Sequence, residues 1–138
     1  MIKYSLVGFD GSESSKRAFR FAMDLARLCG GRVRVASVLQ VTEGGVDASA
    51  QLIADSSTDH THALLKELIA MAPDAEHMVD VDVTYGSPGD VLLAQVREHA
   101  VDHVVIGHTE RGALARWLVG SVSNDVLARA HVPVTVVR

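Results

Sequence analysis

The chain has little cysteine, little proline and few aromatic residues. Each of these shortages excludes some structural features and favours others. It contains one cysteine, Cys29, so no internal disulfide can form and a reducing compartment is expected. Cys29 ends an Ala/Leu-rich helical pattern and is expected to be a small buried hydrophobic residue rather than a nucleophile. Three prolines and 4% aromatic residues leave Ala, Val and Leu to build the core, which suits helices packed on a sheet.

Long apolar runs and basic runs are also missing. No stretch approaches the roughly 18 apolar residues of a membrane span, so we expect no membrane partner. The formal net charge is −4, with Arg interspersed among Asp and Glu. Such a surface has no patch of Lys and Arg that could bind a nucleic-acid backbone, so we expect no nucleic-acid partner. Residues 1–4 run directly into an expected strand without a signal peptide, which favours a cytoplasmic protein.

The length and the hydrophobic content predict one folded domain over residues 1–138. Hydrophobic residues make up 48% of the chain and charged residues 22%, as in globular proteins. A chain of 138 residues can bury a core but is too short for two ordinary domains.

Five stretches have the apolar or alternating pattern of β-strands. The strictly alternating third stretch indicates a half-exposed edge strand, and the last one carries Pro133 near its start, where a missing donor does least harm. The five stretches are Tyr4–Phe9, Arg32–Leu39, Met78–Thr84, His103–Ile106 and Val132–Val137.

Helical patterns alternate with these strands. The first helix is capped by Ser12 or Ser14 and ends at Gly30–Gly31, the residues best able to adopt positive φ. The second runs from about His60 until Pro73 stops it.

A third helix follows the turn Tyr85–Asp90, and its apolar face includes Leu92 and Val96. Residues 41–59 contain two adjacent glycines and several Ser, Thr and Asp residues, and they are expected to form a mobile insertion. A short helix over Ala48–Ala54 is compatible with the sequence but is not predicted.

Alternating strands and helices predict a doubly wound α/β sheet with right-handed crossovers. Ligands of such sheets bind outside the carboxyl ends of the strands, where the strand order reverses. Asp10–Gly11, after the first strand, and Gly107, after the fourth, are therefore the expected walls of a binding crevice.

The stretch that follows Gly107 is suited to an anion. A polar loop leads to Gly120, and the next residues, Ser121–Asp125, look like the start of a helix. The first N–H groups of a helix lack partners and lie at its positive end, so they bind small anions. The simpler interpretation of Ser121 and Ser123 is helix capping, which is compatible with ligand binding.

Familiar phosphate loops and catalytic motifs are absent. Gly107 and Gly112 have the glycine spacing of a Walker A loop, but Ala113–Leu114 replace its Lys and Ser/Thr. The first turn lacks a G-x-G-x-x-G fingerprint, and no G-x-S-x-G elbow occurs. We assign no catalytic residue.

The seven histidines lack zinc-ligand spacing, so no metal site is predicted, and most are expected at the surface. His108 differs because it lies at the crevice rim. Asp10 is the one carboxylate at the crevice, where it either caps the turn or binds a ribose or a metal ion.

Five motifs in order resemble the universal stress protein family over nearly the whole chain. The resemblance implies a five-stranded parallel sheet of order 3-2-1-4-5 with helices on both faces, and a homodimer that pairs the last strands. The motifs are Phe9–Ser12, Tyr85–Pro88, Val104–Gly107, Leu118–Ser123 and Val132–Val134.

One branch of that family binds ATP through a motif of the form G-x2-G-x9-G-[ST]. Here Gly107 matches the first glycine and Gly120–Ser121 the last pair. The resemblance implies that Asp10 contacts the ribose or a metal ion and that Val38 lies near the adenine. Residues 121–123 (Ser121, Val122 and Ser123) would then bind the phosphates of ATP, with or without Mg²⁺.

The sequence departs from this motif at its second glycine, where Glu110 stands. A carboxylate about 4 Å from a phosphate repels it by roughly 4 kcal/mol at an effective dielectric constant of ~20.

Three hypotheses for the function follow. The first is a small cytoplasmic regulatory homodimer that binds ATP or another adenine nucleotide. The second is a nucleotide-free interaction module whose phosphate site Glu110 closes. The third is slow nucleotide hydrolysis or autophosphorylation on Ser121 or Ser123.

Overall fold

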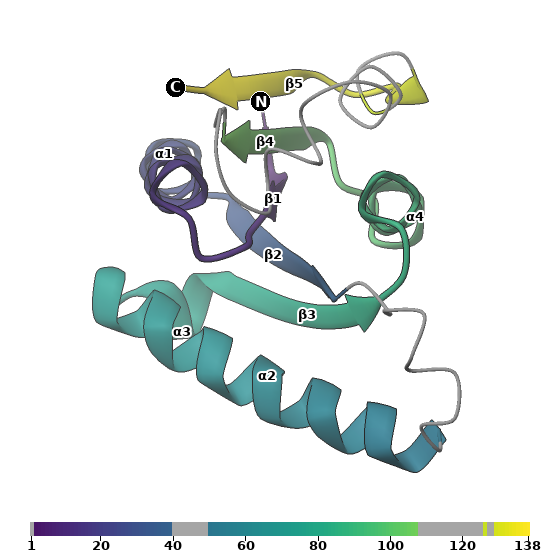
Figure 1. Ribbon diagram of the computed structural model, residues 1–138. Coiled ribbons are helices and arrows are strands. Elements are labelled where there is room, and N and C mark those ends of the chain that lie inside the picture. Colours follow the sequence, from purple (N-terminus) through teal and green to yellow (C-terminus); the bar gives the residue numbers. More distant parts are fainter. Residues whose placement is uncertain (1, 40–49, 108–125, 127–128) are drawn as a thin grey trace.

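A computed structural model describes residues 2–39, 50–107, 126 and 129–138, with the side chains of 50–58 excepted. Strands and helices alternate through these ranges (Figure 1). The elements are β1 (Tyr4–Gly8), α1 (Glu13–Cys29), β2 (Arg32–Leu39), α2 (Ala50–Met71), α3 (Ala75–Met78), β3 (Val79–Tyr85), α4 (Pro88–Glu98), β4 (His103–Gly107) and β5 (Val134–Val137).

The five strands form one parallel sheet of order β3-β2-β1-β4-β5. Its register places Val7 beside Val35 of β2 and beside Val105 of β4. The predicted doubly wound α/β fold and its strand order are confirmed. So is the edge position of β3, which the alternating pattern of its sequence indicated.

Helices cover both faces of the sheet (Figure 1). On one face, α1 and α2 pack on a core that includes Val7, Phe9, Phe19 and Leu68. On the other face, α4 packs on a smaller core around Leu6, Ala36 and Ile106, among others. Few aromatic residues are needed because small side chains let the helices lie close to the sheet.

Two residues fix the ends of α1. Ser12 is the N-cap, since its side chain accepts a hydrogen bond from Ser15 N. Gly30 is the C-cap, with φ 67 in the left-handed region that favours glycine. Both ends agree with the sequence-based prediction. Of the two candidate caps, Ser12 is the one used, and Ser14 is buried.

The helix α2 begins well before the predicted residue His60. It starts at Ala50, inside the segment 41–59 that was expected to be a mobile insertion and in which a short helix over Ala48–Ala54 was only compatible with the sequence. The expected start of the helix near His60 was therefore wrong. Forming the first turn of a helix is unfavourable, and here burial of Leu64 and Leu68 in the core stabilises that first turn. Once such a nucleus has formed, each further residue adds a hydrogen bond at little cost, which lets the helix continue through the weak helix formers at 55–59.

Two residues are buried differently from the prediction. His103 is only 2% exposed, so it is not among the surface histidines. Its Nδ1 lies 2.9 Å from Ser5 Oγ and its Nε2 lies 2.8 Å from Thr135 Oγ1, so both ring nitrogens have partners. Hydroxyl groups on the two neighbouring strands thus make the burial possible. Cys29 is half-buried rather than buried.

In the described ranges, no helix is both long enough and apolar enough to cross a membrane.

Candidate functional site

The turn after β1 is built by Asp10, Gly11 and Ser12. Ser12 N donates a hydrogen bond to Asp10 Oδ1 at 2.9 Å, and Gly11 between them has φ +85, which only glycine adopts without strain. One carboxylate oxygen of Asp10 is therefore used to hold the turn. Its other oxygen, Oδ2, has no hydrogen bond within the described residues and can serve a ligand.

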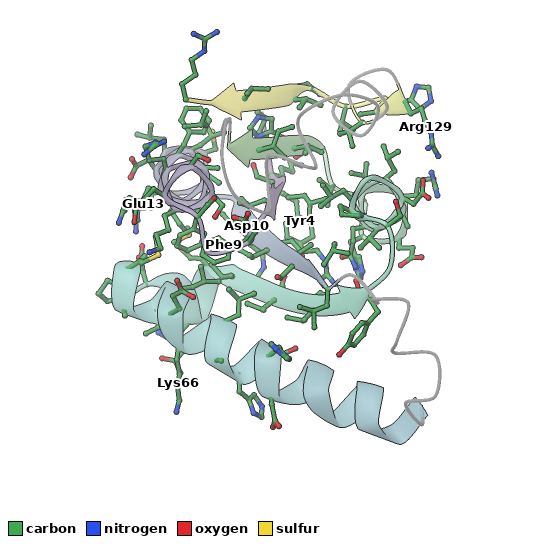
Figure 2. The ribbon with its side chains drawn as sticks, viewed as in Figure 1. Tyr4, Phe9, Asp10, Glu13, Lys66 and Arg129 are labelled. Atoms are coloured by element: carbon green, nitrogen blue, oxygen red, sulfur yellow. The ribbon has the colours of Figure 1, made fainter. Side chains whose placement is uncertain are left out.

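A cavity of about 260 Å³ opens beside this turn, between the ends of β1 and β2 and the helix α2. Figure 2 shows Phe9 and Asp10 between α1 and α2. The volume is close to the lower end of small-molecule pockets, roughly 300–1,000 Å³. The lining residues are Phe9, Asp10, Gly11, Ser37, Leu39, His60, Ala63, Leu64, Glu67 and Val83.

The cavity is acidic. Asp10 and Glu67 bring two carboxylates to it, and His60 is the one basic side chain among the lining residues that the structure describes. Negative charge repels phosphate, whereas carboxylate oxygens accept hydrogen bonds from hydroxyl and amino groups. The cavity therefore suits the uncharged, donor-rich part of a ligand better than an anionic part.

The wall supplied by α2 was missed in the sequence. His60, Ala63, Leu64 and Glu67 have the spacing i, i+3, i+4, i+7, which places them along one face of a helix. The spacing was a usable signal. What the sequence does not reveal is that this helix packs along β3 and brings these four residues to a cavity at the ends of β1 and β2.

The main chain of β2 extends past the end of β1. Phe9 N donates to Ala36 O at 3.0 Å, and this bond ends the ladder between the two strands. Backbone groups of a strand alternate in direction, so the N–H and C=O of Val38 point to the same side as those of Ala36. At that level β1 has already turned away, and no hydrogen bond within the described residues joins Val38 to the turn. Within the described residues, the N–H and C=O of Val38 thus form a donor and an acceptor side by side that the turn after β1 does not use.

The side chain of Val38 does not reach the cavity. It is 9% exposed and belongs to the core under α4, on the opposite face of the sheet from Phe9. Its expected place near a ligand therefore applies to its backbone and not to its side chain.

Gly107 ends β4 directly beneath the first turn of α1. A Cβ at this position would lie 2.3 Å from Ser14 O and 2.5 Å from Ser14 C, distances that no side chain tolerates. The close approach brings the second expected wall of the crevice next to the N-terminus of α1. Gly107 therefore has a packing role of its own, whatever binds nearby.

The hydroxyl of Ser14 is an exception in this first turn. Ser14 is 3% exposed, and its Oγ is buried without a hydrogen-bond partner. Such orphaned groups are uncommon in folded proteins because their desolvation is not repaid. The position next to Gly107 makes this hydroxyl a candidate partner for a ligand group.

The remaining predicted site residues lie outside the described residues: His108, Gly120, Ser121, Val122 and Ser123, together with Glu110. The structure thus brings Asp10, Gly11, the backbone of Val38 and Gly107 to one edge of the sheet. Within the described ranges, no group of three or more His, Cys, Asp or Glu side chains could hold a metal ion.

Comparisons with known proteins agree with this architecture. The model of the universal stress protein family matches residues 1–138. The stress response protein NhaX of Bacillus subtilis is 26% identical, with 96% of each chain covered. A universal stress protein of Methanocaldococcus jannaschii is 26% identical over 100% of this chain and 83% of its own length. The crystal structure of a universal stress protein in complex with cAMP is 26% identical, with a TM-score of 0.73 and coverage of 99% of this chain and 97% of that chain.

Proposed function

Since the chain belongs to the universal stress protein family, we propose that it is a small cytoplasmic regulatory protein of the stress response. In this proposal it binds ATP or another adenine nucleotide and acts as a homodimer. The observation that carries the proposal is the acidic cavity beside Asp10, which is also lined by Ser37 and Leu39, the two neighbours of Val38 on β2.

The base and the sugar would occupy the carboxyl edge of the sheet. Adenine presents a donor next to an acceptor on its pairing edge, and the N–H and C=O of Val38 are the complementary pair. The free Oδ2 of Asp10 would accept a hydrogen bond from a ribose hydroxyl. A related structure at 26% identity is a complex with cAMP, which supports an adenine nucleotide as the ligand class.

The phosphates would point away from the acidic cavity, towards Gly107. There the residues Gly120–Ser123 would offer N–H and hydroxyl groups, as the family resemblance implies. The buried hydroxyl of Ser14 lies on the same side. With Mg²⁺ present, the charge of a triphosphate next to Glu110 would be partly offset.

The homodimer would form through β5. This strand is an edge of the sheet, and Val136 on it is 42% exposed. An edge strand presents unpaired N–H and C=O groups, and pairing two copies of β5 would satisfy them.

The alternative is a nucleotide-free interaction module in which Glu110 closes the phosphate site. Its support is the charge of Glu110 together with the two carboxylates of the cavity. The nucleotide-binding hypothesis and the nucleotide-free hypothesis share the same fold and family, and they differ only in whether a nucleotide binds.

Calorimetric titration with ATP plus Mg²⁺, AMP and cAMP separates the two. We expect saturable binding by the wild-type chain and a loss of roughly tenfold or more in Asp10→Asn, since the amide keeps the bond to Ser12 N but loses the charge. Asp10→Ala also removes the hydrogen bond from Ser12 N that holds the turn, so we expect a larger loss of affinity than for Asp10→Asn. No heat in wild type and clear binding in Glu110→Gly would instead support the nucleotide-free module.

A further inference from the structure

A buried histidine joins three neighbouring strands near the amino edge of the sheet, where the strands begin. His103 is the first residue of β4 and is 2% exposed. Its ring bonds Ser5 of β1 through Nδ1, at 2.9 Å, and Thr135 of β5 through Nε2, at 2.8 Å. The strands β1, β4 and β5 lie side by side (Figure 1). The imidazole thus links the middle of the sheet to its outermost strand.

The strand β5 has the least burial to hold it in place. It is four residues long and none of them is buried, whereas all five residues of β4 are buried. Within the described sheet it pairs with β4 alone. A side-chain bond from the core, such as the one between His103 and Thr135, is therefore expected to matter more for β5 than for an inner strand.

The two hydroxyl partners suit a neutral ring. A neutral imidazole has one donor and one acceptor nitrogen, and a hydroxyl can serve either of them. In a protonated imidazole both nitrogens donate, so the hydroxyl that donated to the ring must turn its hydrogen away. The positive charge would also have to be held in a buried site, which is unfavourable.

The charged groups around the ring offer it limited help. Asp102 is adjacent, but its carboxylate already accepts hydrogen bonds from Lys3 N at 2.9 Å and from Tyr4 N at 3.0 Å. Burial lowers the pKa of His103, and the carboxylate of Asp102 only opposes this shift. None of the other titratable or charged groups on the elements packed against the ring is buried. They are Lys3 and Tyr4 at β1, Glu13, Lys16, Arg17, Arg20, Asp24, Arg27 and Cys29 of α1, and His131 and Arg138 beside β5.

We propose that protonation of His103 releases β5 from the sheet, so that mild acid opens this edge of the molecule while the other strands stay paired. Release of β5 exposes the ring to water, which solvates the imidazolium. Because the closed form binds fewer protons than the open form, β5 is held fully above about pH 6.5 and more weakly as the pH falls below that value.

The release has a consequence for assembly that rests on the proposed homodimer. The proposed dimer forms through β5, so a released β5 no longer presents a paired edge to the second copy. Acid should therefore dissociate the dimer.

Native-state amide hydrogen exchange of the full chain tests the release. NMR at about pH 7.5 and about pH 5.5, corrected for intrinsic exchange rates, gives the protection of each amide. Protection of the β5 amides should fall by up to about tenfold in acid, since an imidazole in water with a pKa of about 6.5 is about 90% protonated at pH 5.5. Unchanged protection of β5, with a fall in β2, would mean that His103 is charged only on complete unfolding, and would overturn the proposal.

Three variants assign the effect to the ring. In His103→Gln, which does not titrate, the acid-induced fall in β5 protection should disappear. His131→Gln is the matched control, because His131 is an exposed histidine on the segment before β5, and this variant should keep the wild-type fall. Thr135→Val removes the partner hydroxyl and should lower β5 protection roughly fivefold already at pH 7.5. An equal fall in wild type and His103→Gln, or its loss in His131→Gln, would contradict the assignment.

Light scattering at both pH values separates the release from the homodimer. A dimer at pH 7.5 that dissociates at pH 5.5 in wild type, but not in His103→Gln, supports both proposals. A chain that is monomeric at both pH values, and whose β5 amides still lose protection in acid, overturns the homodimer and supports the release.

Discussion

The two edges of the sheet carry cavities whose described lining residues differ in charge. At the carboxyl edge, Asp10 and Glu67 bring two carboxylates. At the amino edge, Arg97, Arg129 and His131 bring basic groups. The difference matters for the carboxyl edge, whose carboxylates favour hydrogen-bond donors such as ribose hydroxyls. The described linings of the two cavities differ in the charge of their side chains.

The edges also differ in how they are built. The carboxyl edge depends on backbone features that only glycine permits, namely the positive φ of Gly11 and the close approach of Gly107 to α1. The amino edge is made of side chains that project from a regular helix and from a connecting segment. Substitutions of Gly11 or Gly107 should therefore damage the fold, whereas substitutions of side chains at the amino edge should not.

The largest effect should come from Gly107→Ala. Its Cβ would sit 2.3 Å from Ser14 O, a backbone atom that cannot move without displacing α1. We expect a loss of about 3 kcal/mol in the free energy of unfolding, measured with urea. Gly30→Ala is the control, since open space surrounds it and only its positive φ opposes the change, at about 1 kcal/mol. A smaller loss for Gly107→Ala than for Gly30→Ala would remove the packing role assigned to Gly107.

Mild acid should destabilise the fold through His103. Burial lowers the pKa of its imidazole, and the carboxylate of Asp102 opposes this shift. A lowered pKa means that the folded chain binds fewer protons than the unfolded chain. The stability from this group is therefore complete above the ordinary value of about 6.5 and falls as the pH decreases below it.

Urea unfolding at about pH 7.5 and about pH 5.5, for wild type and for His103→Gln, measures this contribution. The wild-type chain should lose more stability on acidification than the variant does. Equal losses would show that His103 is not responsible.

A smaller effect is expected for Glu67→Gln on nucleotide affinity. Removing one carboxylate from the cavity should raise the affinity for ATP roughly threefold, because a charge about 7 Å away in water contributes about 0.6 kcal/mol. Glu76→Gln, on the short helix α3 outside the cavity, should have no effect. Calorimetry of both variants provides the comparison, and a weaker affinity in Glu67→Gln would mean that Glu67 binds the ligand directly.

The smallest effect should be that of Ser14→Ala. Its buried hydroxyl has no partner, so removing it should leave the stability unchanged or raise it by less than about 0.5 kcal/mol. If stability falls instead, the hydroxyl makes a bond in the folded chain. If stability holds while ATP affinity falls, Ser14 belongs to the phosphate side of the site.

Most of the fold could be predicted from sequence because its signals are local. Ser12 and Gly30 mark the ends of α1, and the alternating residues of β3 mark an edge strand. Features that depend on distant partners could not be predicted. His103 is buried because Ser5 and Thr135, on two other strands, bond its ring.

The candidate site divides in the same way. Asp10, Gly11 and Gly107 follow from the rule that ligands bind at the carboxyl ends of strands. The wall formed by His60 and Glu67 depends on how α2 packs beside β3, which the sequence does not state. The cavity at the amino edge joins residues more than thirty positions apart, and no local pattern links them.

Amide NMR during titration with cAMP tests the central contrast between the two edges most directly. The account predicts that the largest shifts occur at Asp10, Gly11 and Val38, and that the amides of Arg97, Arg129 and His131 do not move. Absence of any saturable shift, or shifts concentrated at the amino edge, would contradict it.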